Sequence, residues 1–173
     1  MVTLKDAVIV IPIFTDPTLH PLHRNNFLSA LYVREPSGAV EMRTFNHLDG
    51  LTRGSFDDLM DRTLLTPHKK HLLSVYPFPS VYDMDLLNYY QRNKPMSLED
   101  IRINAIDVLT NRHYKTNNIN MMIPLYKHQE YCDVVADRID ELRSNADEAD
   151  WESYQLYNNN AVLALYSIER NGL

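Results

Sequence analysis

The feature that most constrains the fold is an unbroken apolar run near the start of the chain, Ala7 to Phe14, with the sequence AVIVIPIF. A strand that carries apolar side chains throughout is typical of one buried on both faces of a sheet, because a solvated face would bring polar residues into alternation. The run is too short to cross a bilayer. A chain of 173 residues is long enough to cover both faces of such a sheet within a single domain.

The first half of the chain predicts further strands. Phe27 to Arg34 and Val40 to Phe45 are separated by the turn sequence EPSG, which favours an antiparallel hairpin. A short helix is predicted next, from Phe56 to about Leu65, because Ser55 is a good N-cap. Two more strands are predicted, over His71 to Tyr76 and Ser80 to Leu87.

The second half predicts helices. One follows the N-cap Ser97, one begins near Pro124, and a last one runs from about Asp150 to Arg170. In the helix after Pro124, apolar residues and His128 recur every three or four positions, the spacing of one buried face. The expected fold is α/β, with a mixed central sheet of about five strands flanked by helices. No glycine-rich phosphate loop follows any strand, which excludes Rossmann and P-loop interpretations.

Charge and cysteine content narrow the function classes. From residue 129 to the end there are ten Asp and Glu against three Lys and Arg, so the rest of the chain is close to neutral. A phosphate backbone would therefore meet the earlier part of the chain. The single cysteine, Cys132, excludes an intramolecular disulfide and a cysteine-rich zinc site. We expect a cytoplasmic location and no membrane association.

The end of the chain resembles a known family. The segment Asn158 to Leu173, NNNAVLALYSIERNGL, is similar to the helix that leaves the 3'–5' exonuclease domain and enters the thumb of A-family DNA polymerases. The residues that carry the match are Leu165, Glu169, Asn171 and Gly172. The resemblance implies a single exonuclease-like domain over residues 1–173, of viral origin, in which helix 150–173 leads into a polymerase module that this chain lacks.

The predicted element order carries a second resemblance. Exonucleases of the DEDD group, with a ribonuclease H-like fold, begin with three strands, continue with a helix and return to the sheet. Their first strand carries Asp-x-Glu, followed by Leu-Asp-Pro. Aligning that tripeptide with Leu19 to Pro21 places Ile13 and Thr15 where the two acids belong, and leaves Asp16 as the nearest carboxylate. The alignment implies that the metal-binding pair is lost.

The remaining motifs of that family are partly present. VYDMDLL, Val81 to Leu87, resembles the segment that supplies the next acid, so Asp83 or Asp85 would correspond to it. His128 and Asp133 have the His-x4-Asp spacing of the last motif, which implies a general base and a metal ligand. If the helix begins at Pro124, however, the two residues lie roughly 140° apart and His128 faces the core. If it begins at His128 or later, they can share a site.

These observations favour a degenerate, non-catalytic exonuclease-like domain that supports a DNA polymerase or contacts DNA, with no cofactor. Losing both bridging acids removes the cage needed for two cations about 3.5–4 Å apart. One alternative is an active exonuclease that holds magnesium or manganese with Asp16, Asp83, Asp85 and Asp133 and uses His128 as general base. Another is a small viral adaptor that binds a protein partner through its acidic helices.

Other polar residues have simpler interpretations. His20, His23, His47, His68 and His71 lie on separate predicted loops and strand ends, so surface or hydrogen-bonded roles are favoured over a metal centre. Cys132 lies within a predicted helix, where a buried thiol is expected rather than a nucleophile. The eleven tyrosines include several that could stack on bases, although tyrosine is also common at helix–sheet contacts.

Overall fold

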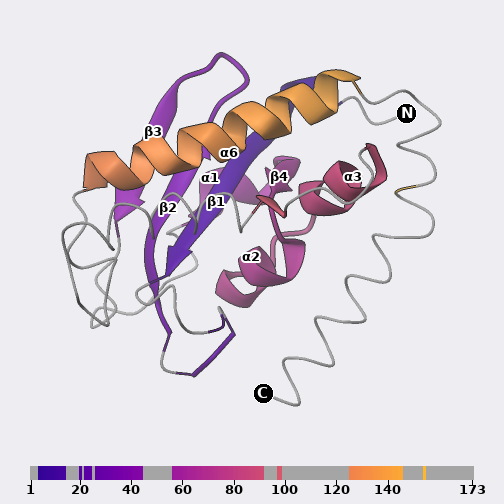
Figure 1. Cartoon of the computed structure of the whole chain (residues 1–173). Helices are drawn as coiled ribbons and strands as arrows, with labels where there is room; N and C mark the ends of the chain where they lie inside the picture. The colour runs from indigo at the N-terminus through magenta and orange to yellow at the C-terminus, as the bar shows by residue number, and fades with distance from the viewer. Residues whose placement is uncertain are drawn as a thin grey trace, which may run out of the picture.

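The computed structural model describes residues 4–14, 20, 22–24, 26–44, 56–91, 97–98, 125–145 and 154. They form a five-stranded sheet with helices against both of its faces (Figure 1). The α/β fold with a mixed central sheet, predicted from the sequence, is therefore confirmed.

In chain order the elements are the 3-10 turn η1 (Leu4–Asp6), β1 (Val8–Phe14), β2 (Leu28–Arg34), β3 (Val40–Thr44), α1 (Asp57–Met60), β4 (Leu64–Thr66), α2 (Lys69–Val75), β5 (Val81–Asp83), α3 (Met84–Gln91) and α6 (Leu125–Asn145). The strand order across the sheet is β3-β2-β1-β4-β5. β1 to β3 are antiparallel neighbours, whereas β4 and β5 run parallel to β1. Three strands, a helix and a return to the sheet are the order expected for a ribonuclease H-like fold.

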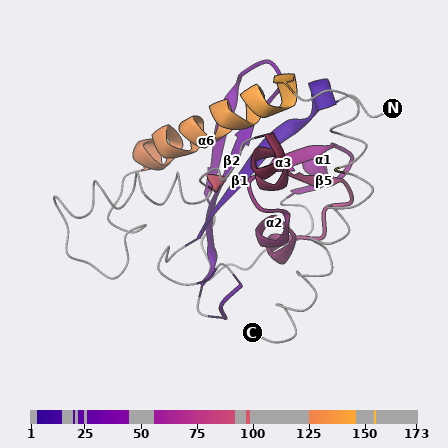
Figure 2. The same cartoon turned by 45° about the vertical axis from the view of Figure 1, so that its right-hand side comes forward.

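The central strand β1 divides the core into two halves, as the unbroken apolar run predicted. All seven of its residues are buried. Val8 and Val10 pack on the face covered by α1 and α2, through Phe56 and Leu72. The alternate side chains of β1 pack on the opposite face, which α6 covers. Figure 2 shows α6 on one side of β1 and β2 and α2 on the other.

The hairpin predicted around EPSG is also present. β2 and β3 pair in antiparallel register from Ala30 with Thr44 to Arg34 with Val40. Gly38 has φ of 96°, the left-handed region that favours glycine, so the turn depends on this residue.

The predictions between residues 56 and 87 were partly wrong. The predicted strand His71 to Tyr76 is helical, because α2 occupies residues 69–75 and buries Leu72 against the sheet. The predicted helix Phe56 to Leu65 ends at Met60, and Leu64 and Leu65 instead join the sheet in β4. β4 has only three residues, too few for the period-2 pattern that marks a strand in a sequence.

The predicted strand Ser80 to Leu87 is correct only in its first half. β5 ends at Asp83, and α3 begins at the next residue. The side chain of Asp83 accepts a hydrogen bond from the backbone N–H of Leu86, which is N-cap geometry. The strand therefore ends where a capping residue starts the helix.

The helix predicted near Pro124 is α6, which begins at Leu125 and runs antiparallel to β1 across the sheet (Figure 1). Its predicted buried stripe is confirmed, with His128, Cys132, Val135, Ile139 and Leu142 all buried. The helix predicted after Ser97 and the helix predicted over 150–173 lie outside the described residues, apart from Leu98 and Tyr154. Both of these are buried, and the Tyr154 ring stacks on Tyr82 at 6.0 Å between centroids. No helix of the described part is long and apolar enough to cross a membrane.

Candidate functional site

The candidate site lies where the parallel strands β4 and β5 end. Thr66 and Asp83 are register partners at these ends. In open α/β sheets the carboxyl ends of parallel strands are the usual place for ligands, because the following loops and helix starts converge there. The hydroxyl group of Thr66 is buried and makes no hydrogen bond with any described residue. The ends of β4 and β5 therefore bring together polar groups within an apolar core.

Asp83 is held by two helix starts. Its side chain is buried, with 3% of its surface exposed. One carboxylate oxygen accepts the N–H of Lys69 at 2.9 Å, at the start of α2, and the other accepts the N–H of Leu86 at 3.1 Å. Burial raises the pKa of Asp83, although these donors and the nearby His68 oppose the shift. Both oxygens of this carboxylate are thus engaged in holding α2 and α3 to the sheet.

Asp85, in the first turn of α3, is likewise engaged in local structure. Its Oδ1 accepts the N–H of Leu98 at 2.8 Å, and its Oδ2 lies 3.6 Å from Nε2 of His68. Its own N–H donates to the carbonyl oxygen of Pro67 at 3.2 Å. The side chain therefore connects α3, the loop after β4 and the segment around Leu98.

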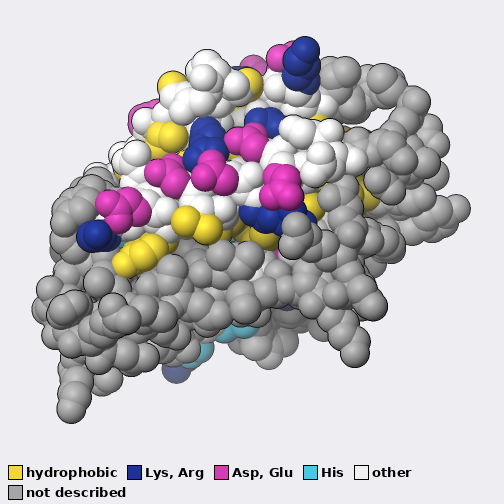
Figure 3. Space-filling view, turned by 45° about the horizontal axis from the view of Figure 1, so that its top comes forward, with side chains coloured by type: hydrophobic (Ala, Val, Ile, Leu, Met, Phe, Trp, Pro, Cys, Tyr) yellow, Lys and Arg dark blue, Asp and Glu magenta, His cyan; other side chains and the backbone are white. Residues whose placement is uncertain are grey.

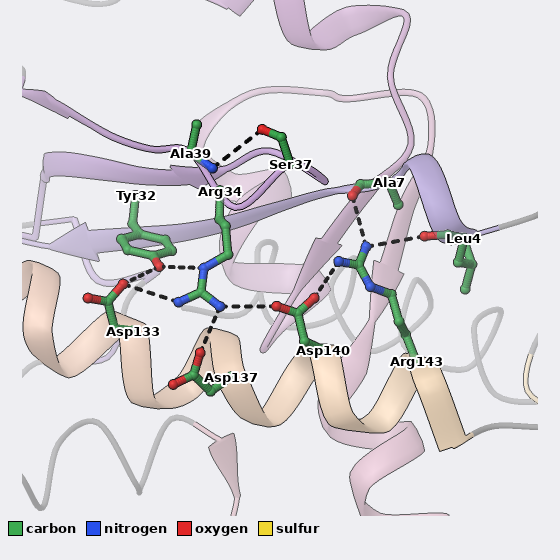
Figure 4. A network of polar contacts seen from close by, with 10 residues as sticks. All are labelled: Leu4, Ala7, Tyr32, Arg34, Ser37, Ala39, Asp133, Asp137, Asp140 and Arg143. Carbon is green, nitrogen blue, oxygen red and sulfur yellow. Dashed lines mark hydrogen bonds and ion pairs between the residues drawn. The ribbon is translucent and has the colours of Figure 1, made fainter.

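Asp133 belongs to a different network, between α6 and β2 (Figure 4). Its Oδ1 accepts the hydroxyl hydrogen of Tyr32 at 2.5 Å and lies 3.2 Å from Nη2 of Arg34. The same guanidinium group also binds Asp137 at 2.8 Å and Asp140 at 3.0 Å. Burial raises the pKa of Tyr32 and the bond to Asp133 adds to this, so the hydroxyl remains a donor at neutral pH.

Removing the hydroxyl group of Tyr32 tests this network. We expect Tyr32→Phe to lower the free energy of unfolding by about 1.5 kcal/mol, because Asp133 loses a charge-assisted hydrogen bond while the ring stays packed. Urea unfolding followed by circular dichroism measures the change. Tyr131→Phe, at a half-exposed tyrosine of α6, is the matched control and should cost less than about 0.5 kcal/mol. Equal losses in the two variants would contradict the assigned role of Tyr32.

His128 and Asp133 do not face the same surroundings. α6 begins at Leu125, which is the condition under which the sequence placed His128 on the apolar stripe. His128 is 4% exposed, whereas the side chain of Asp133 is 38% exposed and faces β2. Five residues along an α-helix correspond to roughly 140° of rotation. The structure therefore places these two residues on different sides of α6.

The described carboxylates do not fit a two-metal cage. Asp133 is held beside β2, whereas Asp83 is at the end of β5, three strands further across the sheet. Three strand spacings of about 4.8 Å separate β2 from β5 by roughly 14 Å. The guanidinium group of Arg34 already neutralises the charge of Asp133. The position expected for the first acid is occupied by Ile13, which is buried. Among the described residues no group of three or more His, Cys, Asp or Glu is arranged to hold a metal ion. Asp16 lies outside the described residues.

Sequence reasoning missed how three histidines converge near this site. The rings of His68 and His71 lie 4.7 Å apart, and those of His20 and His71 lie 5.7 Å apart edge to face. His68 and His71 are spaced by three residues, which places them on one side of a helix. As long as residues 71–76 were predicted as a strand, the spacing of three residues did not indicate that these two histidines lie on the same side. Arg34 was missed because a single basic residue at the end of an apolar strand carries no motif.

Comparison of the chain with models of protein families, with curated proteins and with solved structures found no match.

Proposed function

We propose that this chain is a degenerate, non-catalytic 3'–5' exonuclease-like domain that supports a DNA polymerase module or contacts DNA. The observation that carries the proposal is the engagement of the candidate metal ligands in holding the fold. Asp83 caps two helices, Asp85 accepts a backbone N–H, and Asp133 is paired with Arg34 and Tyr32. A cation at any of these carboxylates would have to compete with the donors that hold it, and at Asp133 with the positive charge of Arg34.

The charge distribution on α6 supports the same proposal. Each of the five acidic residues of this helix lies in an ion pair, and the bases are Lys127, Arg34, Arg138 and Arg143. Figure 3 shows acidic and basic side chains interleaved on this face. A polyanion would be repelled less here than the acid count of the sequence indicates. A protein partner that recognises an acidic helix face would meet acidic side chains that are already paired with basic groups.

A nuclease assay tests the non-catalytic assignment. Labelled single-stranded DNA is incubated with the purified chain and increasing magnesium or manganese, and the products are separated by length. We expect no metal-dependent shortening, and no difference between the natural chain and Asp133→Asn. Shortening that needs the metal and disappears in Asp133→Asn would overturn the proposal in favour of an active exonuclease. Shortening that persists equally in the variant would indicate a contaminating nuclease.

A further inference from the structure

β3 is the edge strand on the antiparallel side of the sheet, and among the described residues no strand pairs with its outer side. It lies on the side of the sheet away from α2 and α3 (Figure 1). The opposite edge strand, β5, has three residues and passes directly into α3, whereas β3 has five. An edge strand of this length offers a row of backbone donors and acceptors to another strand.

The hydrogen bonding of the β2–β3 hairpin determines which backbone groups of β3 face outward. At the turn, the N–H of Glu35 donates to the carbonyl oxygen of Ala39 at 2.9 Å, so this carbonyl group points toward the β2 side of the hairpin. Successive residues of a strand direct their backbone groups alternately to its two sides. Val40, Met42 and Thr44 therefore direct their N–H and C=O groups away from β2, and the residues between them bond to β2.

The side chains of β3 also alternate between the two faces of the sheet. Val40 and Met42 pack partly against the core cluster that includes the buried face of α6. Arg43 pairs with Asp58 of α1 on the opposite face. Glu41 lies on that opposite face as well, 3.2 Å from Nε of Arg43, and its side chain is 62% exposed. The edge strand thus carries an acid and a base on either side of Met42.

Two copies of this strand are complementary to each other when they pair antiparallel about Met42. Val40 of one copy is then opposite Thr44 of the second copy, so all the outward-facing residues form hydrogen-bonded pairs. Glu41 is opposite Arg43 of the second copy, in non-hydrogen-bonded pairs, where side chains approach most closely. Each acid then has one base beside it on its own strand and another across the two-fold axis.

Other registers of the same pairing are less favourable. Centring it on Glu41 places two glutamates opposite each other, and centring it on Arg43 places two arginines opposite each other. Each of these shifts also leaves one hydrogen-bonded pair of β3 residues fewer than the register about Met42. Charge and hydrogen bonding therefore select the same register.

We propose that β3 is a homodimer interface, through which two copies of this chain join their sheets about a two-fold axis at Met42. The axis is perpendicular to the sheet, so α6 lies on the same face in both copies. This interface goes beyond the proposed function, because it assigns a partner that is neither DNA nor a polymerase module. Contact along a single strand edge is small, so we expect dimerisation between about 1 and about 100 µM.

Sedimentation velocity of the full chain over that concentration range measures the association. We expect the mass to increase from one copy to two. Glu41→Arg and Arg43→Glu should each weaken dimerisation about tenfold, because each variant places like charges opposite each other across the axis. An equimolar mixture of the two variants should form a heterodimer, since every base of one chain then faces an acid of the other.

Asp6→Arg is the matched control for charge reversal, at an exposed acid before β1, two strands from the edge. It should change the dissociation constant by less than about twofold, because an exposed charge about 10 Å away is largely screened. Circular dichroism confirms that each variant is folded.

Cysteine pairing tests the register without changing a charge. Met42→Cys brings two thiols together at a Cα separation of about 5.5 Å, which suits a disulfide, whereas in Thr44→Cys the two Cα atoms are about 14 Å apart. We expect mild oxidation to join two copies of Met42→Cys and to leave Thr44→Cys as single chains. The natural cysteine, Cys132, is buried.

Three results would overturn the interface. These are a natural chain that stays monomeric over the whole range, a dimer that Glu41→Arg and Asp6→Arg weaken equally, and equal cross-linking of the two cysteine variants. Absence of a heterodimer in the mixture of charge-reversed variants would overturn it as well. Each of these measurements is made without DNA or metal, so failure of the interface is distinguishable from failure of the proposed function, which the nuclease assay tests.

Discussion

Replacing Asp83 with alanine is expected to lower the free energy of unfolding by about 4 kcal/mol, because one buried and one partly buried backbone N–H group lose their acceptor at once. These are the N–H of Lys69 and the N–H of Leu86, at the starts of α2 and α3. Asp83→Asn should lose about half as much, since the amide keeps one oxygen acceptor but turns an NH2 group toward the second donor. The pKa of the aspartate is raised by burial, so asparagine also avoids part of the cost of a buried charge.

Chemical unfolding of the three proteins measures these differences, and Asp57→Asn provides a matched control. Asp57 is exposed in the first turn of α1, where an acid gains only from the helix dipole, so its loss should be below about 1 kcal/mol. Stability of Asp83→Ala within the range of this control would show that Asp83 does not hold the two helices. Stabilisation of the natural chain by magnesium, absent in Asp83→Asn, would instead identify Asp83 as a metal ligand and contradict the proposed function.

The long elements of the fold could be predicted because their patterns extend over enough residues. β1 is an unbroken apolar run, and α6 repeats its buried positions from His128 to Leu142, over about four turns. Neither element needed information from elsewhere in the chain. β4 and β5 have three residues each and are fixed by pairing with β1 and with each other. A helical pattern in residues 69–75 was not recognised, because Leu72 and Leu73 are adjacent and fit a strand equally well.

The sequence identified the acidic residues of the candidate site but not their roles. Asp83 was placed on a strand and Asp133 on a helix, where the structure has them, whereas Asp85 was placed on the predicted strand and lies in α3. Whether such an acid binds a cation or caps a helix depends on the donors brought to it by segments distant in the sequence. Lys69 reaches Asp83 across fourteen positions, and Tyr32 reaches Asp133 across 101. No local pattern in the sequence records these pairings.

The structure also explains part of the excess of acidic residues after residue 129. Asp133, Asp137 and Asp140 follow one another along the side of α6 that meets the arginine at the end of β2. Arg143, one turn further, donates to the carbonyl oxygens of Leu4 and Ala7 at the start of β1. The acids of this helix thus attach it across the antiparallel half of the sheet, and Arg34 is the residue that most of them share (Figure 4).

Replacing Arg34 with methionine should therefore lower the free energy of unfolding by about 2 kcal/mol. The aliphatic part of the side chain is retained, but three carboxylates on one helix face lose their shared counter-ion and repel each other. The loss is smaller than for a fully buried pair, because Asp137 is 74% exposed and water screens its charge. Chemical unfolding at low and high salt measures it. Salt should reduce the difference between Arg34→Met and the natural chain, since it weakens the repulsion.

Arg43→Met on the neighbouring strand is the matched control for this substitution. Arg43 pairs at the surface with Asp58 and Glu41, and the first of these is 61% exposed, so less than about 1 kcal/mol should be lost. Adding Asp133→Asn to Arg34→Met should recover part of the stability, because one of the repelling charges is removed. Equal losses for the two arginines, or no recovery in the double variant, would mean that packing rather than charge attaches α6 to β2.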